Sequence, residues 1–166
     1  MSVLLETVGL KKYFQTAAGK LHAVDDINLK IGKGETLGVV GESGCGKSTL
    51  GRVILRLLEA DAGQILFEGK DLAKYKTEKD WMTIRGKKIS MVMQDPMTSL
   101  NPLKKIGRQI EESIELNQGI KGPEAKKMAL EMLKKVGIPD PERRYQQYPH
   151  EFSGGQRQRI GIARAL

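Results

Sequence analysis

The sequence predicts a mixed α/β fold in which a β-rich first part is followed by an α-helical insert. Three observations lead to this prediction. A glycine-rich loop lies between an apolar run at 36–40 and an apolar helical pattern from Leu50 to Leu58, strand patterns flank this loop, and the apolar period becomes helical after Pro102. Within one domain we expect a β-rich core over 1–100, a helical subdomain over 101–152 and a last helix over 153–166.

The strands of the first part are predicted from their apolar residues. Residues 24–31 mix apolar and polar side chains as a half-buried strand does, and the glycines at 32–34 turn the chain into the apolar run at 36–40. Residues 63–67 and 88–93 are two more short runs of this kind. We therefore expect four strands around the glycine-rich loop.

The glycine-rich loop fits the pattern G-x-x-x-x-G-K-[ST] at every fixed position and has the strand and helix that the pattern requires on its two sides. Its glycines let backbone N–H groups turn toward phosphate oxygens, and the positive end of a helix adds to the attraction. Lys47 is expected to bind β- and γ-phosphates, and the Ser48 hydroxyl is expected to bind Mg²⁺. A turn without a ligand is the alternative, which the matched flanks disfavour. The predicted nucleotide-binding residues are Gly41, Glu42, Ser43, Gly44, Cys45, Gly46, Lys47, Ser48 and Thr49.

Composition places the chain among globular proteins. Its 166 residues suit one domain, and 39% apolar residues are enough for a core. Arg52 and Arg56 interrupt the longest apolar run, and the first ten residues lack the features of a signal peptide, so we expect a cytosolic chain. The single cysteine, Cys45, builds no disulfide; a reactive thiol is one interpretation and a small loop residue is the favoured one.

The charge of the chain raises the question of nucleic-acid binding. The net charge is +8, and basic residues outnumber acidic ones between Lys70 and Lys88. The aromatic side chains on which bases would stack are limited there to Tyr75 and Trp81. We therefore interpret this segment as a solvated face and expect no nucleic-acid partner.

The insert is predicted to contain three helices. The first carries apolar residues at helical spacing from Leu103 to Ile114, the second begins at Gly122-Pro123 and ends at Gly137, and the third begins at Asp140-Pro141. The apolar face expected for the second helix consists of Ala125, Met128, Met132, Leu133 and Val136. Its methionines are interpreted as core residues.

A second glycine-rich segment, Ser153-Gly154-Gly155-Gln156, opens the last helix. Its S-x-x-Q spacing is that of a capping box, which is a purely structural interpretation. Two glycines in a first helical turn are poor helix formers, however, and they leave backbone N–H groups bare. We therefore expect a second anion-binding site at this helix N-terminus.

These residues resemble the nucleotide-binding subunits of ABC transporters over the whole chain. The run from Phe152 to Arg164 is similar to the signature sequence of that family, Gln94-Asp95-Pro96 is similar to its Q-loop, and Tyr13 is similar to the aromatic residue that stacks on adenine. The segments 99–102 and 150–153 are similar to the oligopeptide and dipeptide permease branch.

The resemblance implies a P-loop ATPase core with a β-rich N-terminal subdomain and a helical insert. It implies ATP and Mg²⁺ as ligands, with Gln94 binding Mg²⁺ and positioning water, and with Ser153, Gly154, Gly155 and Gln156 contacting the ATP of a second subunit. Two like or unlike subunits would close head to tail, and the insert would contact transmembrane permease subunits. The implied role is to power import of peptides or similar solutes from the inner face of the membrane.

In that family an apolar strand ending in Asp-Glu follows the signature, and then a histidine. Neither is present, so we expect the N-terminal part of such a subunit, truncated before the Walker B strand and without the catalytic Glu. Asp95 is an alternative Walker B residue, but the adjacent Gln94 favours the Q-loop. His22 and His150 are poorly placed to be the missing histidine.

Two alternatives from other classes remain. DNA-repair and chromosome-structure ATPases share both glycine motifs, but they carry a long coiled coil for which the segment 101–151 leaves no room. The other alternative is a nucleotide-binding module without turnover.

Overall fold

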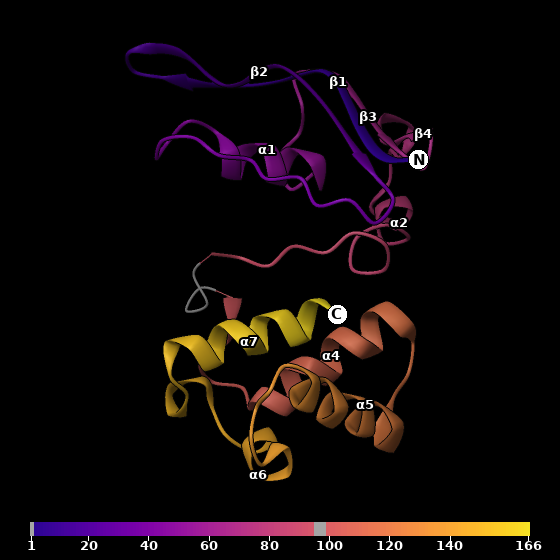
Figure 1. Ribbon diagram of the computed structural model, residues 1–166, viewed down its shortest axis with the longest axis vertical. Helices are drawn as coiled ribbons and strands as arrows, with labels where there is room; N and C mark the ends of the chain where they lie inside the picture. Colours follow the sequence, from indigo (N-terminus) through magenta and orange to yellow (C-terminus); the bar gives the residue numbers. More distant parts are fainter. Residues whose placement is uncertain (1, 95–98) are drawn as a thin grey trace. The chain divides into compact units, whose positions relative to one another are not determined.

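The computed structural model describes residues 2–94 and 99–166, which form two compact units, Met1–Trp81 and Met82–Leu166. Figure 1 shows that the first unit contains the β-sheet and the second is built from helices. None of the helices in the described ranges is both long and apolar enough to cross a membrane.

The sheet of the first unit is antiparallel. Strands β1 (Val3–Thr16) and β2 (Gly19–Gly32) form a long hairpin, β3 (Ala62–Phe67) pairs with the other side of β1, and β4 (Lys70–Asp71) pairs with β3. The strand order is therefore β2-β1-β3-β4. The strands predicted over 24–31 and 63–67 are confirmed as parts of β2 and β3.

Strand β1 was missing from the sequence-based prediction. Leu5, Thr7 and Leu10 are its buried side chains, and a register shift between Thr7 and Leu10 accommodates Gly9, whose φ is +57°. Thr7 is satisfied in the core because its hydroxyl donates to the Ile27 carbonyl at 3.0 Å. This shift breaks the period of two on which the recognition of a strand depends.

Short helices complete the first unit: α1 (Lys47–Ile54), a 3₁₀ turn at Leu72–Lys74 and α2 (Glu78–Trp81). Helix α1 buries Leu50 and Val53, as its apolar pattern predicts. It ends well before Leu58, however, because the chain reverses at Arg56 with φ +51°. The buried apolar residues of this unit are Leu5, Leu10, Val24, Leu50, Val53, Leu55, Ile65, Phe67, Leu72 and Trp81.

The strands predicted over 36–40 and 88–93 are wrong for this structure. Neither run belongs to the sheet of the described residues, and Ile89 makes only an isolated bridge, with Arg85. Apolar composition favours a strand, but a strand also needs a neighbour that completes its hydrogen bonds. In the described ranges no segment pairs with residues 36–40, and Val40 is 93% exposed.

The second unit contains helices α4 (Ile106–Gln118), α5 (Gly122–Lys135), α6 (Pro141–Tyr145) and α7 (Gly154–Ala165), with a 3₁₀ turn at Pro149–Glu151 before α7. All three helices predicted for the insert are therefore confirmed, but the first begins only at Ile106, because Lys105 is extended. Leu103, predicted on the apolar face of that helix, lies before it and is 85% exposed. Their apolar faces form one core, which consists of Leu100, Ile106, Ile110, Ile114, Ala125, Ala129, Leu133, Ile138, Tyr145, Phe152, Ile160 and Ala163.

The methionines of α5 have the role predicted for them, whereas Asp140 before α6 does not. Met128 and Met132 pack against the core, which confirms their interpretation. Asp140 precedes α6 as predicted, but its side chain makes no capping hydrogen bond because its backbone is left-handed, with φ +48°. Gly107 on α4 could not be replaced, since a Cβ there would lie 2.1 Å from the Tyr145 ring.

Candidate functional site

The glycine-rich loop at 41–46 ends directly at the N-terminus of α1, where its Lys47 folds back over it. Lys47 Nζ donates to the carbonyls of Gly41 at 2.7 Å and Glu42 at 2.6 Å, and it lies 3.4 Å from Cys45 Sγ. Ser48 is exposed in the first turn of α1. The loop therefore presents an ammonium group, a hydroxyl and the free N–H groups of a helix N-terminus in one place, which suits a phosphate ligand.

The loop rests against strand β2 at a bulge. Lys12 pairs with Val24 and Tyr13 pairs with His22, so Ala23 has no partner on β1. A Cβ on Gly46 would lie 1.9 Å from the carbonyl oxygen of Ala23, and Gly46 has φ +96°. Gly46 therefore must be glycine for two reasons, its backbone conformation and this close approach. The contact fixes the start of α1 to the hairpin.

The same bulge brings Tyr13 near the loop, because Tyr13 pairs with the neighbour of Ala23. The Tyr13 ring lies against the His22 ring, with centroids 4.1 Å apart, and Lys20 Nζ lies 4.3 Å from the centroid of the Tyr13 ring. The Tyr13 hydroxyl donates to Asp25 Oδ1 at 2.5 Å. This bond to a carboxylate, reinforced by partial burial and nearby negative charge, raises the pKa of Tyr13 to about 12.

The carboxylates around Tyr13 are held in their ionised forms. The hydrogen bond from Tyr13 is the main cause of the lowered pKa of Asp25, and the bond from His22 Nδ1 adds to it. The backbone N–H of Tyr13 donates to Asp61 Oδ2 at 2.5 Å and is the main cause of the lowered pKa of Asp61. Tyr13 is therefore bonded to carboxylates through both its side chain and its backbone.

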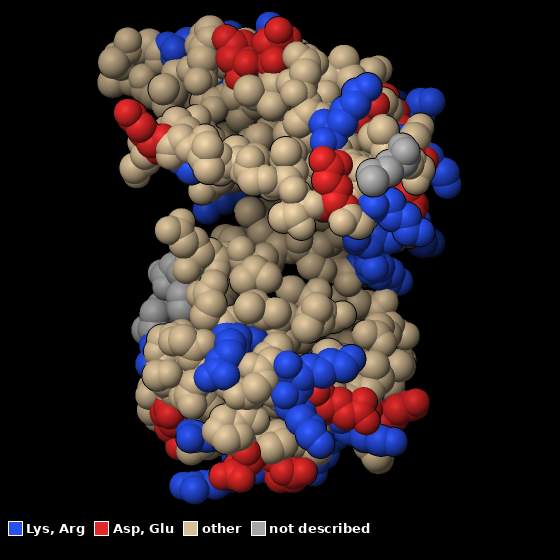
Figure 2. Space-filling model, in the orientation of Figure 1, with Lys and Arg blue, Asp and Glu red and all other residues tan. Residues whose placement is uncertain are grey.

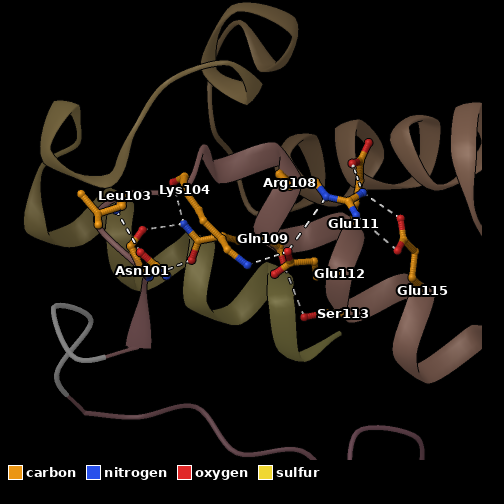
Figure 3. Close-up of polar contacts among 9 residues, drawn as sticks. All are labelled: Asn101, Leu103, Lys104, Arg108, Gln109, Glu111, Glu112, Ser113 and Glu115. Atoms are coloured by element: carbon orange, nitrogen blue, oxygen red, sulfur yellow. Dashed lines mark hydrogen bonds and ion pairs between the residues drawn. The ribbon is translucent and has the colours of Figure 1, made fainter.

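Gln94 lies in the second unit and is exposed. Its neighbours Asp95 and Pro96, which complete the predicted Q-loop, lie outside the described residues, and so does the alternative Walker B role of Asp95. The chain after them is anchored to α4 by Gln109, which is 2% exposed. Figure 3 shows this anchor: the Gln109 side chain accepts from the Asn101 N–H at 2.9 Å and donates to the Asn101 and Lys104 carbonyls.

Helix α7 also holds this segment, because Arg164 donates a hydrogen bond to the Ser99 carbonyl. Lys104, just before α4, places its Nζ 2.8 Å from Oε1 of Glu112 on α4, and this bond is the main cause of the lowered pKa of Glu112 (Figure 3). The segment that leaves the predicted Q-loop is therefore tied to α4 and to the helix that begins at the signature.

The signature segment forms the capping box that its sequence predicts. The Ser153 hydroxyl accepts from the Gln156 N–H at 3.3 Å, and the Gln156 side chain accepts from the Ser153 N–H at 3.0 Å. Gly154 and Gly155 have ordinary helical conformations, and a Cβ on either would meet no described atom within 4 Å. The fold of this unit therefore does not itself require glycine at either position.

The structure thus groups Tyr13 with the phosphate loop in the first unit, and it places Gln94 and the signature residues in the second. Sequence reasoning missed Ala23, Asp25 and Asp61 as neighbours of this site. Spacing gives no signal for Asp61, which is distant from Tyr13 in sequence. For Ala23 the signal is the unmatched register of β1 and β2, which becomes visible only when the strands are paired.

Comparison with known proteins agrees with the predicted resemblance. The sequence pattern described as "ABC transporter" matches residues 24–166. The chain is 49% identical to the oligopeptide transport ATP-binding protein OppD of Bacillus subtilis, over 98% of this chain and 47% of OppD. It is 44% identical to the oligopeptide transport ATP-binding protein AmiE of Streptococcus pneumoniae, over 99% of this chain and 48% of AmiE. The chain spans about half the length of these relatives.

Solved structures of ATP-binding cassettes have the same fold. A dimeric post-hydrolysis state of the cassette MJ0796, bound to ADP and Pi, matches with a TM-score of 0.87 and 29% identity over 98% of this chain and 69% of that one. The cbiO1 protein of Clostridium perfringens, part of the transporter complex cbiONQ, matches with a TM-score of 0.75 and 28% identity, over 100% of this chain and 62% of that one. The predicted α/β P-loop fold is confirmed, and the chain belongs to the ABC transporter family as a homologue of ATP-binding proteins of peptide import.

Proposed function

We propose that this chain binds Mg–ATP on its phosphate loop and forms the ATP-binding part of a subunit that powers import of peptides or similar small solutes. The phosphate loop carries this proposal. Its Lys47, its exposed Ser48 and the N-terminus of α1 converge there, and Gly46 packs against Ala23 with no space for a side chain. The names of OppD and AmiE support peptides as the solute class.

Different residues of the first unit bind different parts of the nucleotide. The loop amides from Ser43 to Thr49 bind phosphate oxygens. Lys47 Nζ exchanges its bonds to the Gly41 and Glu42 carbonyls for the β- and γ-phosphates, because bonds between charged partners are the stronger ones. Tyr13, next to the bulge that contacts the loop, stacks on adenine.

The Ser48 hydroxyl, which is exposed in the first turn of α1 beside the phosphate loop, would hold Mg²⁺. The proposed role of Gln94, in the second unit, as a further oxygen ligand rests on the family resemblance alone. When bound, the ion would reduce the charge on the phosphate oxygens. Gln94 would also orient the water that attacks the γ-phosphate.

The signature segment serves a second subunit. Gly154 and Gly155 leave the N-terminus of α7 bare, although neither their conformation nor their surroundings require glycine. Open space above free N–H groups suits the γ-phosphate on the loop of a partner chain. The dimeric structure of the MJ0796 cassette bound to ADP and Pi supports a dimer. In the proposed dimer, two like or unlike subunits close head to tail.

The resemblance to ABC transporter subunits supports a contact of the helical unit with transmembrane permease subunits, and with it a location in the cytoplasm at the inner face of the membrane. Leu103 and Leu116 of this unit are 85% and 69% exposed, and such apolar side chains suit contact with another protein.

ABC ATPases hydrolyse ATP, but the 166-residue polypeptide by itself holds nucleotide with hydrolysis at background. Its sequence has no apolar strand ending in Asp-Glu after the signature, so no carboxylate of that kind polarises the attacking water. Phosphate release that disappears in Lys47→Ala would contradict this proposal, and Asp95 would then be the first carboxylate to replace.

Nucleic acid is not part of the proposal. In Figure 2, basic side chains gather in a dense group on the right, but acidic side chains lie among the basic ones over the rest of the face drawn. DNA binding that weakens steeply as salt is raised would favour the DNA-repair class instead.

Calorimetry with Mg–ATP tests the proposal. Lys47→Ala is expected to weaken binding by about tenfold or more, since a hydrogen bond to a charged group contributes about 1.5–3 kcal/mol. The chain should keep its stability, because Lys47 bonds only to exposed loop atoms. Lys33→Ala is a control that removes the same charge from the loop after β2. Equal affinity in wild type and Lys47→Ala would overturn the proposed site.

A further inference from the structure

Tyr13 is held from two directions by carboxylates that lie far apart in sequence. Asp25, on β2, accepts from the phenol hydroxyl, and Asp61, just before β3, accepts from the backbone N–H. Both distances are 2.5 Å. Two charge-assisted bonds to one residue restrict both its backbone position and the direction of its ring.

Each carboxylate is held in turn by a basic group. His22 Nδ1 lies 3.1 Å from Asp25 Oδ2, and Lys12 Nζ lies 3.3 Å from Asp61 Oδ1. The side chains of Asp25 and Asp61 are 47% and 41% exposed. Ion pairs with such exposure add little to the stability of a fold. The main effect of these bonds is therefore to orient Tyr13, and their contribution to the free energy of unfolding is small.

The orientation of Tyr13 matters because of what lies next to it. The ring packs on His22, whose neighbour Ala23 contacts Gly46 of the phosphate loop. A planar ring held beside the phosphate loop can stack on the base of a nucleotide whose phosphates occupy that loop. A ring ordered before binding loses less freedom when the ligand arrives.

We infer that Asp25 and Asp61 are positioning residues that fix the Tyr13 ring for stacking on the nucleotide base. This inference rests on the proposed function, because it requires nucleotide on the phosphate loop. Both carboxylates carry the same sign of charge as phosphate and are not ligands for it. Their effect is therefore confined to ligands that carry a base.

The test compares the affinities of the 166-residue chain for Mg–ATP and for Mg–tripolyphosphate, which has no base. Asp25→Ala and Asp61→Ala should each weaken ATP binding by about three- to tenfold relative to tripolyphosphate binding, which is the effect of losing one hydrogen bond that orders the ring. Glu59→Ala is the control, since it removes the same charge from a side chain that is 80% exposed and not bonded to Tyr13. A loss of fold alone would weaken both ligands equally.

Tyr13→Ala separates the two ways in which the test can fail. If Tyr13→Ala lowers the preference for ATP but Asp25→Ala and Asp61→Ala do not, the positioning inference is overturned and the nucleotide site stands. If Tyr13→Ala also leaves the preference unchanged, both the inference and the adenine contact are overturned. If Asp61→Ala does not fold, Tyr13→Phe decides, because it deletes only the hydroxyl that Asp25 holds: an unchanged preference in Tyr13→Phe would overturn the inference.

Discussion

The two glycine-rich segments of this chain use glycine for different physical reasons. In the phosphate loop, Gly46 has φ +96°, and a Cβ there would overlap the Ala23 carbonyl at 1.9 Å. In the signature, Gly154 and Gly155 have helical conformations and open space around them. The first segment needs glycine to fold. The second segment does not need glycine for its own fold, and the contact with a partner's phosphate proposed above would account for its glycines.

The two segments also differ in how the first turn of the following helix is capped. Helix α1 begins at a left-handed glycine with no side-chain cap, whereas α7 begins at Ser153 with a complete capping box. Capping satisfies N–H groups that would otherwise be free to bind an anion. No side chain of the described residues caps the N–H groups at the start of α1, so they remain available to an anion. At the start of α7 the capping box binds the N–H groups of Ser153 and Gln156, and Gly154 and Gly155 add no side chains that would cover the first turn.

The largest effect is expected for Gly46→Ala. A left-handed alanine and the overlap with Ala23 together should cost about 2–5 kcal/mol of unfolding free energy. Urea denaturation measures this loss. Gly44→Ala is the matched control, because Gly44 has φ +83° but no described atom within 4 Å of its Cβ position, so only the backbone term remains. Equal losses in the two variants would show that the contact with the bulge is unimportant.

A smaller effect is expected for Ser153→Ala, which removes the hydroxyl that accepts from the Gln156 N–H. Loss of such a cap costs about 1 kcal/mol. The expected shift in the urea midpoint should largely disappear in Ser153→Thr, which keeps the hydroxyl. A midpoint that does not move in Ser153→Ala would mean that water satisfies this N–H equally well.

The smallest effect, of opposite sign, is expected for Gly155→Ala. Alanine is the better helix former by up to about 1 kcal/mol, and the added methyl group meets no described atom. Thermal or urea unfolding should therefore show equal or higher stability. A clear destabilisation would indicate that the second segment, like the first, needs glycine for its own fold.

Much of this arrangement could be predicted from sequence because it depends on local signals. The Gly-Lys-Ser loop, the capping box at Ser153 and the helical spacing of Ile106, Ile110 and Ile114 each lie within a few residues, and each agrees with the structure.

The features that could not be predicted depend on contacts between distant segments. The bulge at Ala23 exists only because of the register of β1 against β2, and Asp61 reaches Tyr13 only because β3 pairs with β1. The run at 36–40 has strand composition, but composition does not supply the partner strand that it needs. Pairing partners are set by tertiary structure, which a local pattern does not encode.

The most direct test of whether the signature glycines serve a partner chain is the mass of the protein in solution with and without Mg–ATP, measured by sedimentation equilibrium for wild type and Gly155→Asp. A carboxylate at this position should not disturb the fold, because it has open space and lies at a helix N-terminus, but it would repel a partner's phosphates. We expect Mg–ATP to convert wild type to a dimer and to leave Gly155→Asp monomeric, with an affinity for ATP equal to that of wild type at concentrations too low for dimerisation. The same ATP-dependent dimer in both proteins, or no effect of ATP on the mass of wild type, would contradict this account.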